Sequence, residues 1–173
     1  MPRKLHIGGQ QKLPDWEVFN VQPGPHVDHV GDAKDLSRFE DETFDELYAS
    51  HVVEHFDYNG PLLDAFKEWY RVLKPEGKLY ISVPDMDVLC QLFRMRKELK
   101  LQDRFQIMRM MFGGHIDQHD YHYVGFDFEI LTAFLSQAKF RNSKRVEDLG
   151  VFKDTSILRV AGILISLNVI AVK

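Results

Sequence analysis

Two polar pairs, Ser50-His51 and Glu54-His55, lie within one short stretch of the chain, FDELYASHVVEHF (residues 44–56). Histidine can accept or donate a proton near neutral pH. The first pair directly follows an apolar run that is typical of a strand buried on both faces. Polar residues at the carboxyl end of such a strand are what an open α/β sheet uses to bind ligands. We therefore interpret this stretch as the centre of a site, against the alternative of a strand and a helix whose histidines are capped or solvated.

A second group of histidines, His115, His119 and His122, is spaced four and three residues apart. On a helix the three side chains would share one face and could bind a metal. Glycines on both sides of this segment favour a loop instead, and no cysteine lies nearby to assist. We therefore predict a histidine-lined loop that contacts a substrate, with no metal bound, and keep a metal site as the rival interpretation.

The composition is that of an ordinary soluble globular protein. The chain of 173 residues suits one domain, and hydrophobic and charged residues make up 45% and 28% of it. The net charge of −4 gives no electrostatic basis for binding a nucleic-acid backbone. The single cysteine, Cys90, suits a reducing compartment. We find no apolar leader and no run long enough to cross a membrane, so the sequence predicts a cytoplasmic protein without a membrane partner.

The pattern of apolar residues and turn residues predicts an α/β domain over the whole chain, 1–173. Only six residues separate Gly9 from Trp16, too few for a helical crossover. An extended segment of that length reaches about 20–25 Å, enough to return along a short strand. The first two strands can therefore be parallel without a helix between them. The predicted strands are 4–7, 16–21, 27–30, 47–49, 78–83, 141–149 and 166–172, and the predicted helices are 61–73, 128–140 and an untidy methionine-rich one over 86–112.

Taken together, several segments resemble the class I S-adenosylmethionine-dependent methyltransferases, and most closely their short bacterial type 11-like members. The segments are LHIGG (5–9), VGDAKDL (30–36), FDELYASHVVEHF (44–56), RVLKPEGKLYISVPD (71–85) and the C-terminal ISLNVIAVK. The resemblance implies a Rossmann-like, doubly wound, mostly parallel seven-stranded sheet whose last strand is antiparallel. It also implies S-adenosylmethionine as cofactor and S-adenosylhomocysteine as product. Residues 86–125 would form a lid or substrate-binding insertion.

The family pattern assigns candidate cofactor contacts by position. Gly8 and Gly9 would line the methionine and ribose side, Asp32 and Ala33 would face the adenine, and Ser50 would lie beneath the sulfonium with His51. The acidic residue that usually binds the ribose diol is replaced by Asn20. An amide binds a diol through neutral hydrogen bonds, which are roughly half as strong as charge-assisted ones.

The family's helices before and after the first strand are missing from the pattern. An uncovered apolar sheet face tends to bind a partner. We therefore hypothesise that the chain associates with itself as a homodimer.

Methyl transfer to an oxygen or nitrogen acceptor requires alignment of donor and acceptor and removal of a proton. His51 and His122 are the candidate catalytic bases. His55, Asp85 and Tyr121 are candidate substrate contacts, although His55 also suits a structural role and Asp85 could cap the next helix. The sequence predicts a methyltransferase for a small molecule, with oxygen as the acceptor. The alternatives are a non-catalytic protein of this fold that binds a nucleoside or a partner and, less favoured without a G-x-G-x-x-G motif, a nicotinamide-dependent enzyme.

Overall fold

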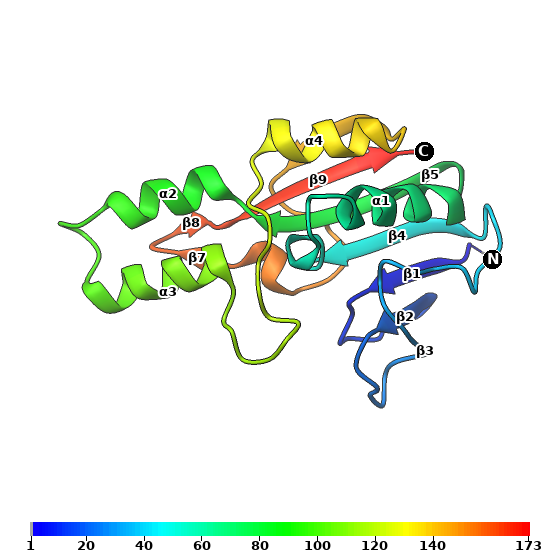
Figure 1. Ribbon diagram of the computed structural model, residues 1–173, viewed down its shortest axis with the longest axis horizontal. Helices are drawn as coiled ribbons and strands as arrows, with labels where there is room; N and C mark the ends of the chain where they lie inside the picture. Colours follow the sequence, from blue (N-terminus) through cyan, green and yellow to red (C-terminus); the bar gives the residue numbers. More distant parts are fainter. Residues whose placement is uncertain (1) are drawn as a thin grey trace.

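A seven-stranded sheet forms the centre of the protein (Figure 1), whose computed structural model describes residues 2–173. The strand order is β3-β2-β1-β4-β5-β9-β6, and β9 runs antiparallel to both its neighbours while the other pairs are parallel. The predicted fold class, a mostly parallel sheet of seven strands with an antiparallel last strand, is confirmed. The strands are β1 (Lys4–Ile7), β2 (Trp16–Asn20), β3 (His29–Val30), β4 (Phe44–Ser50), β5 (Leu73–Pro84), β6 (Arg141–Val146) and β9 (Ser166–Val172).

Two helices, α1 (Pro61–Val72) and α4 (Phe128–Gln137), pack side by side on one face of the sheet (Figure 1). Proline is favoured at the first position of a helix, where its missing N–H would have no partner in any case. Both helices are amphipathic, and their apolar faces bury residues such as Phe66 and Leu131 against the central strands. This layer holds the main hydrophobic core and fixes the positions of the strand ends.

No α-helix covers the opposite face within residues 2–173, as expected from the short connections around β1. The segment between β6 and β9 replaces the missing helices, because Leu149 and Phe152 pack there against Trp16 and Tyr48. The Tyr48 hydroxyl also donates a hydrogen bond of 2.9 Å to Asp154, which holds this segment on the sheet.

The part of this face beyond that segment carries polar side chains, including an ion pair of 3.0 Å between Lys4 and Glu46. It is therefore not the bare apolar surface on which the homodimer hypothesis was based. The hypothesis stays a prediction without that physical support.

A third layer extends beyond the carboxyl end of β5 (Figure 1). It contains α2 (Met86–Arg94), α3 (Leu101–Phe112) and the hairpin of β7 (Arg159–Val160) and β8 (Ile163–Leu164). Leu89, Ile107 and Ile165 form its small core. The single helix predicted over 86–112 is wrong in this respect: residues 95–100 interrupt it, and a new helix begins where the Asp103 carboxylate accepts a hydrogen bond of 3.0 Å from the backbone N–H of Lys100. The hairpin was not predicted. The role of this layer as a lid stays a prediction.

The structure predicts a pH-dependent stability from His6, which is 5% exposed and packs against Phe152 with ring centroids 4.0 Å apart. Burial lowers the pKa of His6 from 6.5 to about 4. The unfolded chain therefore binds this proton at a higher pH than the folded chain. We expect the free energy of unfolding to fall by up to ~3 kcal/mol as the pH drops through this window, from 6.5 to about 4.

Urea unfolding at a series of pH values measures this effect. His6→Phe removes the titration, so its stability should depend less on pH between about 4 and 6.5 than that of the unmodified chain. His26→Gln is the matched control, because the His26 side chain is already exposed to water. Equal pH dependence in the His6→Phe variant and the unmodified chain would show that His6 does not titrate as argued.

Candidate functional site

A cavity of about 520 Å³, which we call the strand-end cavity, lies at the carboxyl ends of the parallel strands. Gly8 follows β1, Asn20 ends β2 and His51 follows β4. The carboxyl ends of parallel strands meet at one edge of a sheet, which is where open α/β folds bind ligands. Other lining residues include Phe19, Gln22, Asp32, Ala33, Lys34, Val52, His55, Phe56, His119 and Tyr123.

The two glycines after β1 have different roles. Gly8 lines the strand-end cavity and adopts a φ of +73°, a conformation that favours glycine. A Cβ at this position would lie 2.4 Å from Cγ2 of Val52. Gly9 is buried outside the lining, and a Cβ there would lie 2.6 Å from the ring of His6. Gly8 thus makes room for the Val52 side chain at the cavity wall, and Gly9 makes room for a buried histidine.

Asn20 holds the glycine turn to the end of β2. Its Nδ2 donates a hydrogen bond of 2.8 Å to the carbonyl of Gly9, and its Oδ1 accepts one of 2.9 Å from the backbone N–H of Gln22. A carboxylate at this position could not donate to Gly9. The two hydrogen bonds within the turn therefore explain why an amide is present at this position. Asn20 also borders the strand-end cavity.

The loop after β3 brings Asp32, Ala33 and Lys34 to the strand-end cavity. Trp69 of α1 fixes this loop by donating a hydrogen bond of 2.8 Å to the Ala33 carbonyl. Asp32 accepts hydrogen bonds from the backbone and side chain of Lys34, each 2.9 Å long. Burial raises the pKa of Asp32, but these bonds lower it more, so the net pKa lies below its ordinary value. The loop therefore presents a carboxylate to the cavity.

A second cavity of about 310 Å³ adjoins the first, and His51 lines both. His122 also lines this second cavity, together with Arg109 of α3. Further lining residues are Pro84, Gln106, Met110, Gly113, Gly114, Ile116, Asp120, Thr155, Leu158 and Ile165. The arrangement allows two ligands to meet beside His51.

His51 is held from both sides of its ring. The Ser166 hydroxyl donates to the carbonyl of Thr155, so its oxygen accepts from His51 Nε2 at 3.0 Å. His51 Nδ1 lies 3.2 Å from Oε1 of Glu54. The residue has a φ of +54°, which is uncommon outside glycine and is often found at functional sites. This backbone turn directs the ring to the boundary between the two cavities.

Glu54 is the buried charge at the centre of this region. It lies in η1 (Val53–His55), is 1% exposed, and neither carboxylate oxygen has a hydrogen-bond partner among residues 2–173. Burial raises the pKa of Glu54, but the nearby His51, His55 and His122 lower it more, so its net pKa is below the ordinary value. Burial lowers the pKa of His122, which favours its neutral form. The geometry thus places an ionised carboxylate among three histidines.

The comparisons with known proteins agree with this architecture. Residues 12–81 match the family model of a methyltransferase domain. A methyltransferase from Archaeoglobus fulgidus, dependent on S-adenosylmethionine, has a similar structure, with a TM-score of 0.64 and 17% identity over 99% of this chain and 86% of that one. The fold is that of the class I S-adenosylmethionine-dependent methyltransferases. The predicted resemblance is confirmed at the level of the fold, with the family model matching residues 12–81.

Two other similar structures show the range of this methyltransferase fold. The 1,6-didemethyltoxoflavin-N1-methyltransferase of Burkholderia thailandensis, solved with 1,6-didemethyltoxoflavin and S-adenosylhomocysteine bound, matches with a TM-score of 0.61 and 16% identity over 99% of this chain and 71% of that one. A candidate exported protein of Bordetella parapertussis matches with a TM-score of 0.61 and 14% identity over 99% of this chain, which spans 62% of its length. No curated protein matches the chain.

Within this methyltransferase fold, three further predicted site residues, besides Gly9, lie outside both cavities. Ser50 faces the same side of β4 as Tyr48, away from the main core. Asp85 caps α2 by accepting from the Val88 N–H at 3.3 Å, and its second oxygen pairs with Arg145. Tyr121 is exposed and stacks on His115 at 4.1 Å. The alternative interpretation of Asp85 as a helix cap is confirmed.

The three histidines of the second group do not converge, because residues 113–127 form a loop, as predicted. His115 bonds the Phe112 carbonyl, His119 lines the strand-end cavity, and His122 lines the second cavity. The rival metal site built from these three residues is therefore absent from the described part of the chain.

Several residues of the methyltransferase-like site were not predicted. Lys34 and Tyr123 border the strand-end cavity, and Arg109 and Thr155 border the second one. Tyr123 is placed by its backbone N–H, which donates 2.8 Å to the carbonyl of Glu54. The only feature of the sequence that could have indicated Tyr123 as a site residue was its position in the histidine-rich loop, two residues before Gly125.

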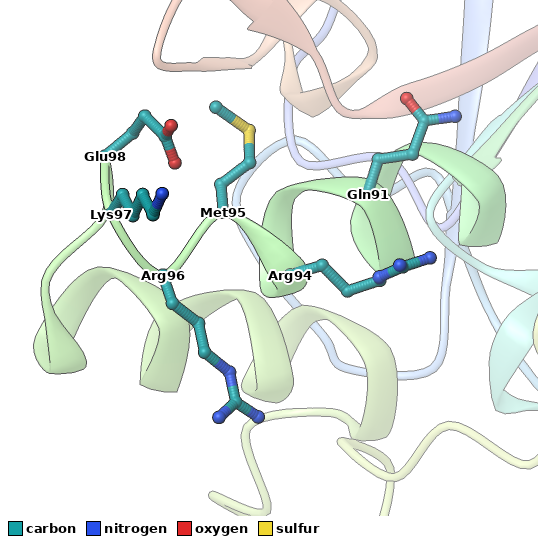
Figure 2. Close-up of a pocket in the computed structure, with 6 residues that line it drawn as sticks. All are labelled: Gln91, Arg94, Met95, Arg96, Lys97 and Glu98. Carbon is teal, nitrogen blue, oxygen red and sulfur yellow. The ribbon is translucent and has the colours of Figure 1, made fainter.

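A further cavity of about 500 Å³ lies at the turn between α2 and α3 (Figure 2). Arg94, Arg96, Lys97 and Glu98 contribute to its lining, with Gln91 and Met95. Figure 2 shows that the Arg94 and Arg96 side chains point in different directions. Since no polar groups converge there and none of these residues lines the other two cavities, we assign it no chemistry.

The structure predicts that Asn20→Asp destabilises the glycine turn. The change removes the bond donated to the Gly9 carbonyl and puts a negative charge beside that oxygen. We expect the free energy of unfolding to fall by about 1–2 kcal/mol, measured by urea unfolding at neutral pH. Asn142→Asp is the matched control on the exposed start of β6 and should change stability by less than about 0.5 kcal/mol. An Asn20→Asp variant as stable as this control would contradict the structural role of the amide.

Proposed function

We propose that the chain is an S-adenosylmethionine-dependent methyltransferase that methylates an oxygen atom of a small molecule. The observation that carries this proposal is the position of His51 between two adjoining cavities. The strand-end cavity would hold the methyl donor, and the second cavity would hold the acceptor. Both volumes are in the range of small-ligand sites.

The strand-end cavity offers groups that suit each part of the cofactor. Gly8 lines the part of the cavity that would hold the methionine portion, and the Asp32 carboxylate could accept a hydrogen bond from the adenine amino group. Asn20 retains one N–H and one lone pair that could bond the ribose hydroxyls. A similar fold is known with S-adenosylhomocysteine bound, which supports the same class of cofactor here.

In the proposed reaction, the acceptor oxygen attacks the methyl carbon in line with the carbon–sulfur bond. That bond breaks, and its electron pair returns to sulfur, so the cofactor leaves as S-adenosylhomocysteine. The acceptor proton passes to a histidine. His122 is better placed than His51 for this role, because both ring nitrogens of His51 already face Ser166 and Glu54. The partly buried His122, whose lowered pKa favours the neutral form, has a lone pair beside the second cavity.

A second candidate function is a non-catalytic protein that binds a nucleoside or a partner. Asn20 and Asp32 favour it, because both side chains also make bonds within their own loops, which would weaken their hold on the cofactor. The two candidates differ in how tightly the cofactor binds and in whether a methyl group is transferred.

Calorimetric titration with S-adenosylhomocysteine tests the proposal. We expect micromolar binding of one ligand per chain, weakened at least tenfold by Asp32→Ala, which corresponds to about 1.4 kcal/mol. Asp35→Ala is the matched control, because Asp35 also accepts a bond within its own turn, from Ser37, yet is exposed and outside the cavity.

An absence of heat and of any thermal shift at millimolar ligand would overturn the methyltransferase proposal. Equal weakening by Asp32→Ala and Asp35→Ala would overturn the adenine assignment. Binding of adenosine as tight as that of S-adenosylhomocysteine would favour the nucleoside-binding alternative.

A further inference from the structure

The region between the two cavities contains three potential metal ligands. The ligand atoms of Glu54, His55 and His122 all lie within 4.8 Å of one another. Two come from η1 and one from the loop that follows α3, so residues far apart in the sequence meet here. Two histidines and one carboxylate form a donor set that is known to bind divalent transition metals with positions left open.

The burial of the Glu54 carboxylate favours a cation-binding role. A fully buried carboxylate is costly unless it is paired or coordinates a metal. Its oxygens have no hydrogen-bond partner within residues 2–173, and Oε1 lies 3.2 Å from Nδ1 of His51. A ring nitrogen of His55 and one of His122 each lie within 4.8 Å of a carboxylate oxygen but make no hydrogen bond to it.

The ring orientation of His55 agrees with a ligand role. A backbone carbonyl can only accept, so His55 Nδ1 carries the proton in its bond of 3.0 Å to the Tyr121 carbonyl. Nε2 then has a free lone pair. Metal-binding histidines generally donate their other N–H to a carbonyl or carboxylate in this way, which fixes the ring. The exposed Tyr121, whose side chain reaches neither cavity, thus orients His55 through its backbone.

We propose that Glu54, His55 and His122 bind one divalent first-row transition metal, of the Zn²⁺, Fe²⁺ or Mn²⁺ class. The two imidazoles favour these ions over Mg²⁺ and Ca²⁺, which prefer oxygen ligands. In a single coordination sphere the donor atoms would lie roughly 3–4 Å apart, so small side-chain rotations complete the site.

The metal would lie where the two cavities meet, since His55 lines the strand-end cavity and His122 lines the second one. A divalent ion polarises an oxygen ligand and makes it easier to deprotonate. The lone pair of His122 cannot bind a metal and accept a proton at the same time. In the metal-bound protein the ion would therefore activate the acceptor oxygen in place of His122.

Metal titration of the untagged, chelator-treated protein tests the proposal. We expect one equivalent of Zn²⁺ to bind by calorimetry, and one equivalent of Co²⁺ to give the visible absorption of a site with nitrogen and oxygen ligands. His55→Asn and His122→Asn should each weaken binding at least tenfold. His115→Asn is the matched control, because it lies in the same loop outside the cluster, and it should change affinity by less than about twofold.

Glu54→Gln keeps the shape of the side chain and should abolish binding of one equivalent. If this buried change impairs folding, the partly exposed His55 keeps the test decisive. Absence of binding to the unmodified chain, or binding that His55→Asn and His122→Asn leave unchanged, would overturn the proposal. Metal binding does not require the cofactor, so this titration and that with S-adenosylhomocysteine can fail independently.

Discussion

The buried carboxylate of Glu54 is the constraint on which the geometry of the site depends. A negative charge with 1% exposure requires compensation, and the chain supplies it from several directions: His51 from the turn after β4, His55 from η1 and His122 from the loop after α3. Each of these elements also borders a cavity. The three histidines that stabilise the charge of Glu54 are therefore also side chains that face the cavities.

The α-helices cover only one face of the sheet, and the segment that covers the other face affects the position of His51. In the absence of helices around β1, the segment between β6 and β9 covers Tyr48 and Trp16 and is held by Asp154. That segment continues into η2 (Thr155–Ile157), whose Thr155 carbonyl accepts from Ser166 and thereby orients His51. The element that replaces the missing layer thus also positions the ring between the two cavities.

The sequence predicted the sheet, the parallel crossover without a helix and the importance of residues 44–56, because these depend on local periodicity and segment length. Ser50, which the family pattern placed beneath the sulfonium, lines neither cavity. Leu47 and Ala49 face the main core, and side chains alternate along a strand, so Ser50 shares the opposite face with Tyr48. The alternation of side chains along the strand already implied this orientation of Ser50, whereas the family resemblance placed the residue beneath the sulfonium.

Other features could not be predicted, because they depend on contacts between distant segments. The spacing of His115, His119 and His122 suggested a shared helix face, whereas only His122 reaches Glu54, across 68 residues of sequence. Arg145, the ion-pair partner of Asp85, lies on β6, and the sequence did not indicate this pair either. A one-dimensional pattern can show which residues are able to bind a metal or cap a helix, but the fold selects those that meet.

Asn20 shows how an apparent departure from a family pattern can have a local cause. An acidic residue at the end of the second strand binds a ribose best when the glycine turn is held by other groups. Here the short connection of six residues between Gly9 and Trp16 contains no helix whose N-terminus could fix that turn. The Asn20 amide supplies the missing hydrogen-bond donor, and only an amide can bond both the Gly9 carbonyl and the Gln22 N–H. In this chain the connection without a helix and the amide at position 20 therefore belong together, because Asn20 supplies the bond that holds the glycine turn.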